Sequence, residues 1–234
     1  MRDRQLRKHV EMERLFGADF LPLSRRPVAA PPVAAPTPPR RAAAEADPPE
    51  IAALREKVAG CAQCDELCSR RTQTVFGVGS LRAPVVFVGE APGEDEDRQG
   101  EPFVGRAGQL LTKTLRDLGV RRSEVYIANI LKCRPPGNRT PKPEEMANCA
   151  PYLYQQIRFI QPKIVCVMGN IAAQNLLDTK TGITKLRGRV HDFNGMRIFP
   201  TFHPAYILRN MGDLKYLVAD LKQVCREAGL IRGE

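Results

Sequence analysis

The stretch PVVFVGEAPGEDED (residues 84–97) joins an apolar run directly to a loop built from glycine, proline and carboxylates. Its first six residues are mostly β-branched or aromatic, which is the composition of a short buried strand. The glycines and the proline that follow end the strand, because they favour turns over regular structure. Three other apolar runs of the same character predict three more strands, at residues 125–132, 163–169 and 196–202.

Segments with helical periodicity lie between and after these strands, at residues 107–119, 142–160, 170–177 and 213–229. This alternation predicts an α/β fold in which a central, mostly parallel four-stranded sheet is covered by helices on both faces. In such sheets ligands bind outside the carboxyl ends of the strands. We therefore expect the loops after the four strands to meet at one pocket.

The first 50 residues differ in composition from the rest of the chain. Residues 25–49 hold too much proline and alanine to build a packed core. We predict that residues 1–50 form a disordered or partly helical arm and linker, and that residues 51–234 form one folded domain. The arm either recruits a protein partner or touches DNA, or it is a dispensable extension.

The balance of charge predicts a polyanionic partner. The chain carries 36 Lys and Arg against 26 Asp and Glu, a net charge of +10, which favours nucleic acid. No apolar run reaches the roughly 18 residues of a membrane span, and the N-terminus lacks the apolar region of a secretory signal. We expect a cytoplasmic, nucleoid-associated monomer with no membrane partner.

Seven cysteines in a reducing compartment suggest a metal rather than disulfides. Cys61 and Cys64 form a CxxC pair, and Cys133 and Cys149 lie far downstream. Four such thiolates suit Zn²⁺ or a [4Fe–4S] cluster, and their spacing does not choose between the two; reduced structural thiols are the third interpretation. Cys68 is surplus and could replace one of the four. We interpret the metal as a structural clip.

Four motifs together resemble the family 4 uracil-DNA glycosylases, the iron–sulfur branch of their superfamily. The motifs are GEAPGEDEDRQGEPFVGRAGQLL (89–111), NILKCRPP (129–136), ITKLRGRVH (183–191) and FHPAYILRN (202–210). The likeness runs from Ile51 to Gly229. It implies an α/β/α sandwich, a [4Fe–4S] cluster on Cys61, Cys64, Cys133 and Cys149, and a monofunctional enzyme that removes uracil from single- or double-stranded DNA in base excision repair.

The resemblance also implies which residues hold the base. Phe103 offers a face on which uracil stacks, and the Asn129 amide donates to and accepts from the base edge at once. His203 is the donor for the negative charge that gathers on uracil O2 as the base leaves. Ala91 stands where the best-known branch of the superfamily has a water-activating aspartate, and its backbone N–H could contact the base or the water.

Glu90 and Glu96 match active-site positions of the family, where a carboxylate orients water and balances the positive charge on the sugar. Glu94, Asp95 and Asp97 are interpreted as residues that only keep the loop solvated.

Contacts to DNA are expected from two other motifs. Ile207 and Leu208 are the predicted wedge that fills the space of the flipped base, and Arg209 is expected to hold a phosphate. Lys185 and Arg187 add phosphate contacts. Two alternatives stay open: a non-catalytic or covalently trapping relative, and a zinc-clipped nucleotide-binding module without glycosylase activity.

Overall fold

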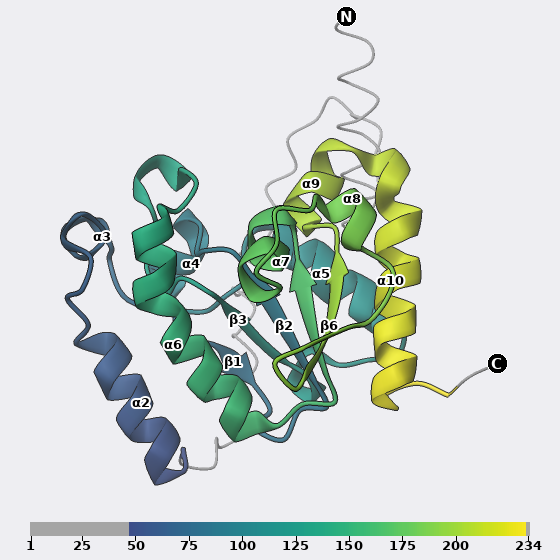
Figure 1. Cartoon of the computed structure of the whole chain (residues 1–234), viewed down its shortest axis with the longest axis horizontal. Helices are drawn as coiled ribbons and strands as arrows, with labels where there is room; N and C mark the ends of the chain where they lie inside the picture. Colours follow the sequence, from purple (N-terminus) through teal and green to yellow (C-terminus); the bar gives the residue numbers. More distant parts are fainter. Residues whose placement is uncertain (1–46, 233–234) are drawn as a thin grey trace, which may run out of the picture. The chain divides into compact units, whose positions relative to one another are not determined.

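A mixed six-stranded sheet forms the centre of the computed structural model, which describes residues 47–232 (Figure 1). The strand order is β1-β3-β2-β4-β6-β5. The four inner strands run parallel, and the two edge strands are antiparallel to their neighbours. The strands are β1 (Val78–Gly79), β2 (Val85–Gly89), β3 (Tyr126–Asn129), β4 (Ile164–Met168), β5 (His191–Phe193) and β6 (Met196–Thr201).

The four predicted strands are confirmed as the parallel core, but the sheet has six strands rather than four. All residues of β2, β3 and β4 are buried, because helices cover both faces, and this produces the continuous apolar runs seen in the sequence. The edge strands are only two and three residues long and partly exposed, so they leave no apolar run to detect.

Helices cover both faces of the sheet (Figure 1). They are α2 (Pro49–Ala59), α3 (Asp65–Arg70), α4 (Glu94–Gln99), α5 (Arg106–Asp117), α6 (Pro143–Ile160), α7 (Asn170–Leu176), α8 (Ile183–Leu186), α9 (Pro204–Arg209) and α10 (Leu214–Ala228). Short 3₁₀ helices span Arg122–Glu124, Pro136–Asn138 and Met211–Asp213. Every helix in the described part of the chain is too short or too polar to span a membrane. Residues 1–46 of the predicted arm lie outside the described residues. Helix α2 begins at Pro49, just before the predicted boundary after residue 50.

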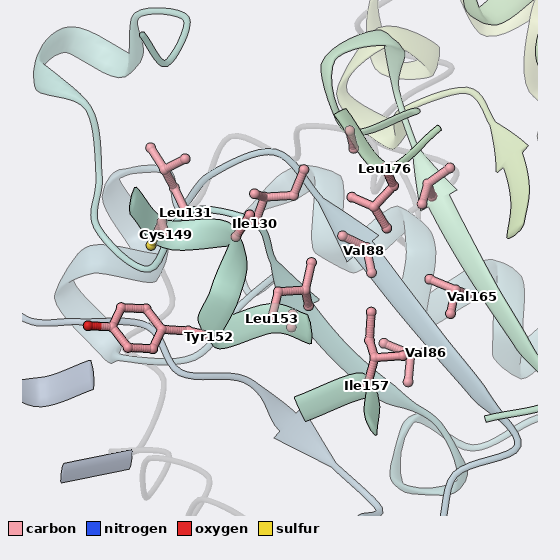
Figure 2. Packing of buried hydrophobic residues seen from close by; sticks show 14 of the residues in the cluster. Val86, Val88, Ile130, Leu131, Cys149, Tyr152, Leu153, Ile157, Val165 and Leu176 are labelled. Carbon is pink, nitrogen blue, oxygen red and sulfur yellow. The ribbon is translucent and has the colours of Figure 1, made fainter. Parts of the chain in front are cut away.

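Alternation along each inner strand divides the core between the two faces. Val86 and Val88 of β2 point to the face of α6, where they pack with Leu153 and Ile157 (Figure 2). Helix α10 packs on the other face, against β2, β4 and β6. Burial of one aliphatic side chain contributes about 1.5–3 kcal/mol to the free energy of unfolding. Because many such side chains pack on both faces, the two helix layers hold the strands, and with them the strand ends, in place.

A buried ion pair fastens the carboxyl end of β6 to α10. Asp220 accepts hydrogen bonds from Thr201 Oγ1 at 2.6 Å and from Arg187 Nη2 at 2.6 Å. The Arg187 side chain is 17% exposed, and its guanidinium also lies over the rings of Phe202 and Tyr216. In this structure a partner within the fold already holds the Arg187 guanidinium, so its DNA contact stays a prediction. Lys185 is exposed, as a phosphate contact requires.

Arg187→Ala leaves the Asp220 carboxylate buried without its cation. We expect a loss of about 3 kcal/mol of unfolding free energy, which lowers the Tm by roughly 6–12 °C in a domain of this size. Thermal unfolding followed by circular dichroism measures the shift. Lys185→Ala is the control, and its Tm stays close to that of the parent. If Arg187→Ala keeps the Tm of the parent but binds DNA more weakly, the result supports the phosphate contact that the sequence predicts for Arg187.

Candidate functional site

A cavity of about 650 Å³ lies at the carboxyl ends of the parallel strands, a volume typical of ligand sites. The loops after β2, β3, β4 and β6 all contribute to its lining, as the strand pattern predicts. Seven of the residues singled out in the sequence meet there: Glu90, Ala91, Glu96, Phe103, Asn129, His203 and Arg209.

Asn129 is the last residue of β3 and is only 2% exposed. Its Oδ1 is buried and has no hydrogen-bond partner, and no other buried side-chain N or O atom in residues 47–232 shares this state. An unpaired buried acceptor costs about 1–3 kcal/mol. The cavity therefore offers a free acceptor that a ligand with an N–H group would satisfy.

Phe103 lies beside this amide, and Gly89 at the end of β2 makes that approach possible. A Cβ on Gly89 would stand 2.4 Å from Asn129 Oδ1 and 2.6 Å from Phe103 Cζ, so neither side chain could keep its place. The Phe103 ring also faces the imidazole of His203, with centroids 5.6 Å apart and planes tilted by 32°. The aromatic face and the amide thus converge at one point.

The loop that carries Phe103 is held by Glu96. Glu96 Oε1 accepts the backbone N–H groups of Val104 and Gly105, both at 3.0 Å, and Oε2 accepts that of Gly93 at 3.1 Å. The predicted catalytic role of Glu96 is therefore corrected to a positioning role, because both oxygens serve the loop backbone. Arg122 braces the other side of the loop by donating to the Pro102 carbonyl.

His203 is held as a neutral donor. The backbone N–H of Ala205 donates to His203 Nδ1 at 3.1 Å, so the proton of the neutral ring sits on Nε2. Burial, and after it the charge of Arg209, lowers the pKa of His203 to about 4. The imidazole is thus uncharged at neutral pH and presents one N–H group.

The four consecutive acidic residues 94–97 form the first turn of α4, where negative charges interact favourably with the positive end of the helix dipole. Glu94 pairs with Arg134, and Asp95 pairs with Arg98. Asp97 corrects the prediction of a merely solvated residue, since it is 4% exposed and accepts the backbone N–H of Thr72.

Glu90, between β2 and α4, is half-buried in the cavity lining, and burial raises the pKa of its carboxyl group.

The predicted wedge is partly wrong. Ile207 is 0% exposed, because the short helix α9 directs its side chain into the core. Leu208 is half-buried and Arg209 is exposed and lines the cavity; their contacts to DNA stay predictions.

Five cysteines line a second, smaller cavity: Cys61, Cys64, Cys68, Cys133 and Cys149. Within residues 47–232, no three Cys, His, Asp or Glu side chains stand close enough to hold a single metal ion. Burial raises the pKa of Cys149 to about 12, and it also raises that of Cys133. These thiols need a cation to become thiolates. The donor set of five thiols in one cavity is chemically suited to Zn²⁺ or to an iron–sulfur cluster.

Lys132 links the two cavities. Its Nζ, 1% exposed, donates to the Asn129 carbonyl at 2.9 Å, to Gln156 Oε1 at 2.7 Å and to the Phe76 carbonyl at 3.1 Å. Its backbone N–H donates to Cys149 Sγ at 3.1 Å. The lysine therefore fixes the end of β3 between the thiols and the cavity.

Two residues of the site, Tyr206 and Arg122, were not predicted from the sequence. Tyr206 lines the cavity, stacks on Phe202 and donates to Asp213, and its place inside the motif at 202–210 was a usable signal. Arg139 also lines the cavity, and Glu145 holds its guanidinium. Arg122 lies outside every motif, and only the folded chain brings it to the Phe103 loop.

Comparison with known proteins agrees with this geometry. The family model of the uracil DNA glycosylase superfamily matches residues 76–224. A type-4 uracil-DNA glycosylase of Thermotoga maritima is 51% identical over 162 residues, which are 68% of this chain and 84% of that protein. The type-4 enzyme of Archaeoglobus fulgidus is 46% identical over 72% of this chain and 88% of its own. A type-5 uracil-DNA glycosylase of Pyrobaculum aerophilum is 31% identical over 76% of this chain and 91% of its own.

The type-4 relatives share markedly more identical residues with this chain than the type-5 relative does, over a similar share of its length. This confirms the family that the motifs indicate. The chain belongs to the uracil DNA glycosylase superfamily, as a member of its type-4 group.

Proposed function

We propose that this protein is a monofunctional uracil-DNA glycosylase, which extrudes uracil from DNA, hydrolyses the N-glycosidic bond and leaves an abasic site for base excision repair. The free Oδ1 of buried Asn129, set against the Phe103 ring, is the observation that carries the proposal. The family of the chain supports the same reaction.

Uracil supplies the groups that this amide lacks. Its N3–H donates to Asn129 Oδ1, and its O4 accepts from Asn129 Nδ2, while the ring stacks on Phe103. Cytosine presents an acceptor at N3 and a donor at N4, so both hydrogen bonds would be lost. A site built around hydrogen bonds rejects such a base strongly, because its own buried groups are then left unpaired.

Bond cleavage needs stabilisation of both fragments. The Nε2–H of neutral His203 donates to uracil O2 as negative charge collects there, an interaction worth roughly 3 kcal/mol. On the sugar side, the Glu90 carboxylate orients the attacking water and balances the positive charge of the oxocarbenium-like transition state. The Ala91 N–H lies in the same lining and contacts the base or the water.

Leu208 takes the wedge position beside the cavity, and Arg209 and Lys185 hold the phosphates on either side of it. Their positive charge predicts an affinity for DNA that falls steeply as salt rises.

The thiols of Cys61, Cys64, Cys133 and Cys149 are the proposed ligands of a [4Fe–4S] cluster. The sulfur donors that line one cavity and the type-4 group of the chain, whose motifs resemble the iron–sulfur branch of the superfamily, support this cluster. When bound, the cluster supplies four iron–thiolate bonds that clip the segment before α3 to the end of β3 and to α6. The thiols hold structure and lie apart from the uracil cavity, so no proton or base transfer passes through them.

Uracil excision tests the proposed function directly. The protein is incubated with a labelled strand that contains one uracil, and alkali then cleaves any abasic site. We expect cleavage at the uracil and none at a cytosine control. Asn129→Ala should lower the single-turnover rate about 100-fold or more with an unchanged Tm, because it removes both base-edge hydrogen bonds.

The absence of product at every protein concentration would end the proposal. A denaturant-resistant protein–DNA adduct in place of free product would favour the covalently trapping relative instead.

The pH profile separates Glu90 from His203. The rate on a uracil-containing single strand should fall as acid protonates Glu90, whose pKa burial raises, and fall again near pH 4 as His203 gains its proton. Glu90→Gln should lower the plateau rate about 100-fold and remove the first fall only. Glu94→Gln, with its side chain 66% exposed, is the control that keeps both falls. A first fall that persists in Glu90→Gln would assign it to another group.

Cysteine variants test the ligand set. Cys133→Ser should lose the brown colour near 400 nm and much of its iron, because one of the four thiolates is gone. Cys68→Ser lines the same cavity and should keep both. Iron and sulfide analysis measures the loss. If Cys68→Ser is colourless and Cys133→Ser stays brown, Cys68 is a ligand in place of Cys133. If the parent protein is colourless and contains zinc, the proposal of an iron–sulfur cluster is wrong.

A further inference from the structure

One buried carboxylate lies outside the chemistry described so far. Asp97 is 4% exposed, and both of its oxygens stand 3.0 Å from the backbone nitrogen of Thr72. We propose that Asp97 is a positioning residue for uracil excision. It fastens α4 to the cysteine-bearing segment, the part of the chain that carries Cys61, Cys64 and Cys68. Through α4 it also holds the loop that carries Phe103. The kinetic part of this inference rests on the proposed function.

The first link joins α4 to residues 72 and 73. Besides the contact to Asp97, Gln73 Nε2 donates to the Arg98 carbonyl at 2.9 Å. A Cβ on Gly100, which ends the helix at φ +75°, would stand 2.6 Å from Gln73 Oε1. A helix of six residues is not stable by itself, so these tertiary contacts set where α4 lies.

The second link joins α4 to the stacking ring. Glu96 stands next to Asp97, and its carboxylate holds the N–H groups of Val104 and Gly105. Phe103 itself has a φ of +54°, a left-handed conformation that costs a residue other than glycine roughly 1–2 kcal/mol. The loop needs external contacts to keep this conformation, and Glu96 delivers them from α4.

The third link joins Thr72 to the thiols. Its neighbour Arg71 donates to the Cys61 carbonyl at 2.8 Å and to Cys133 Sγ at 3.0 Å. An unbroken series of contacts therefore runs from the cysteine cavity through Thr72 and Asp97 to Phe103. A displacement of the cysteine-bearing segment therefore also displaces the Phe103 ring, on which uracil is proposed to stack.

Amide hydrogen exchange of the whole protein tests the first and second links together. In Asp97→Ala we expect the amides of Val104 and Gly105 to exchange at least about 10-fold faster, while strand β4 (Ile164–Met168) keeps its protection. The single-turnover rate on uracil-containing DNA should fall about 100-fold, the effect of a displacement near 1 Å.

Two variants keep the test sharp. Asp97→Asn retains one acceptor oxygen and should give an intermediate effect on both readouts. Asp117→Ala removes an aspartate of α5 that is 54% exposed and should change neither. If Asp97→Ala does not fold, a selective increase of exchange at Val104 and Gly105 in Asp97→Asn still supports the proposal.

Exchange that rises equally in β4, or variants that behave like Asp117→Ala, would overturn it. If the parent protein excises no uracil, the proposed function fails, and the exchange measurement still decides the role of Asp97.

Discussion

The absence of a side chain at Gly89 is the constraint on which the candidate site depends. The Phe103 ring and the Asn129 amide both lie so close to Gly89 that a Cβ there would clash with them, and this brings an aromatic face and a free acceptor to one point. The parallel register sets β3 beside β2 with Asn129 opposite Gly89, so the sheet itself determines this approach. Recognition of a flat base with an N–H edge follows from the geometry of two neighbouring strand ends.

Charge is distributed differently inside and around the cavity. The groups proposed to touch the base are neutral, since His203 has a pKa of about 4 and Asn129 carries no charge. The carboxylate of Glu90 lies in the cavity lining, where the proposed function places the sugar, and Lys185 and Arg209, the proposed phosphate contacts, are exposed. A base that leaves as an anion thus meets a neutral donor, whose hydrogen bond to O2 is stronger in the transition state than with the intact nucleotide.

The sequence predicted the parts of the fold that rest on local composition. The four inner strands are continuous apolar runs because both faces are covered, and the loops behind them had to meet because the strands are parallel. Phe103, Asn129 and His203 could be placed because they lie in these loops and in motifs that resemble the family. The roles of Ile207, Arg187, Glu96 and Asp97 could not be predicted, since each depends on a partner from another element. A short helix such as α9 also shows too few residues for its buried face to be read from periodicity.

The walls of the cavity come from positions between Glu90 and Arg209, and β6, the strand that leads to His203, is the last strand within residues 47–232. During synthesis the amino-terminal part emerges first, so β2, β3 and their glycine contact are made long before β6 leaves the ribosome. A nascent or truncated chain that ends before residue 203 holds the aromatic face and the amide but lacks the imidazole and the rim arginine. Stabilisation of the leaving base therefore arises only after residue 203 has joined the fold, later than the contacts that discriminate the base edge.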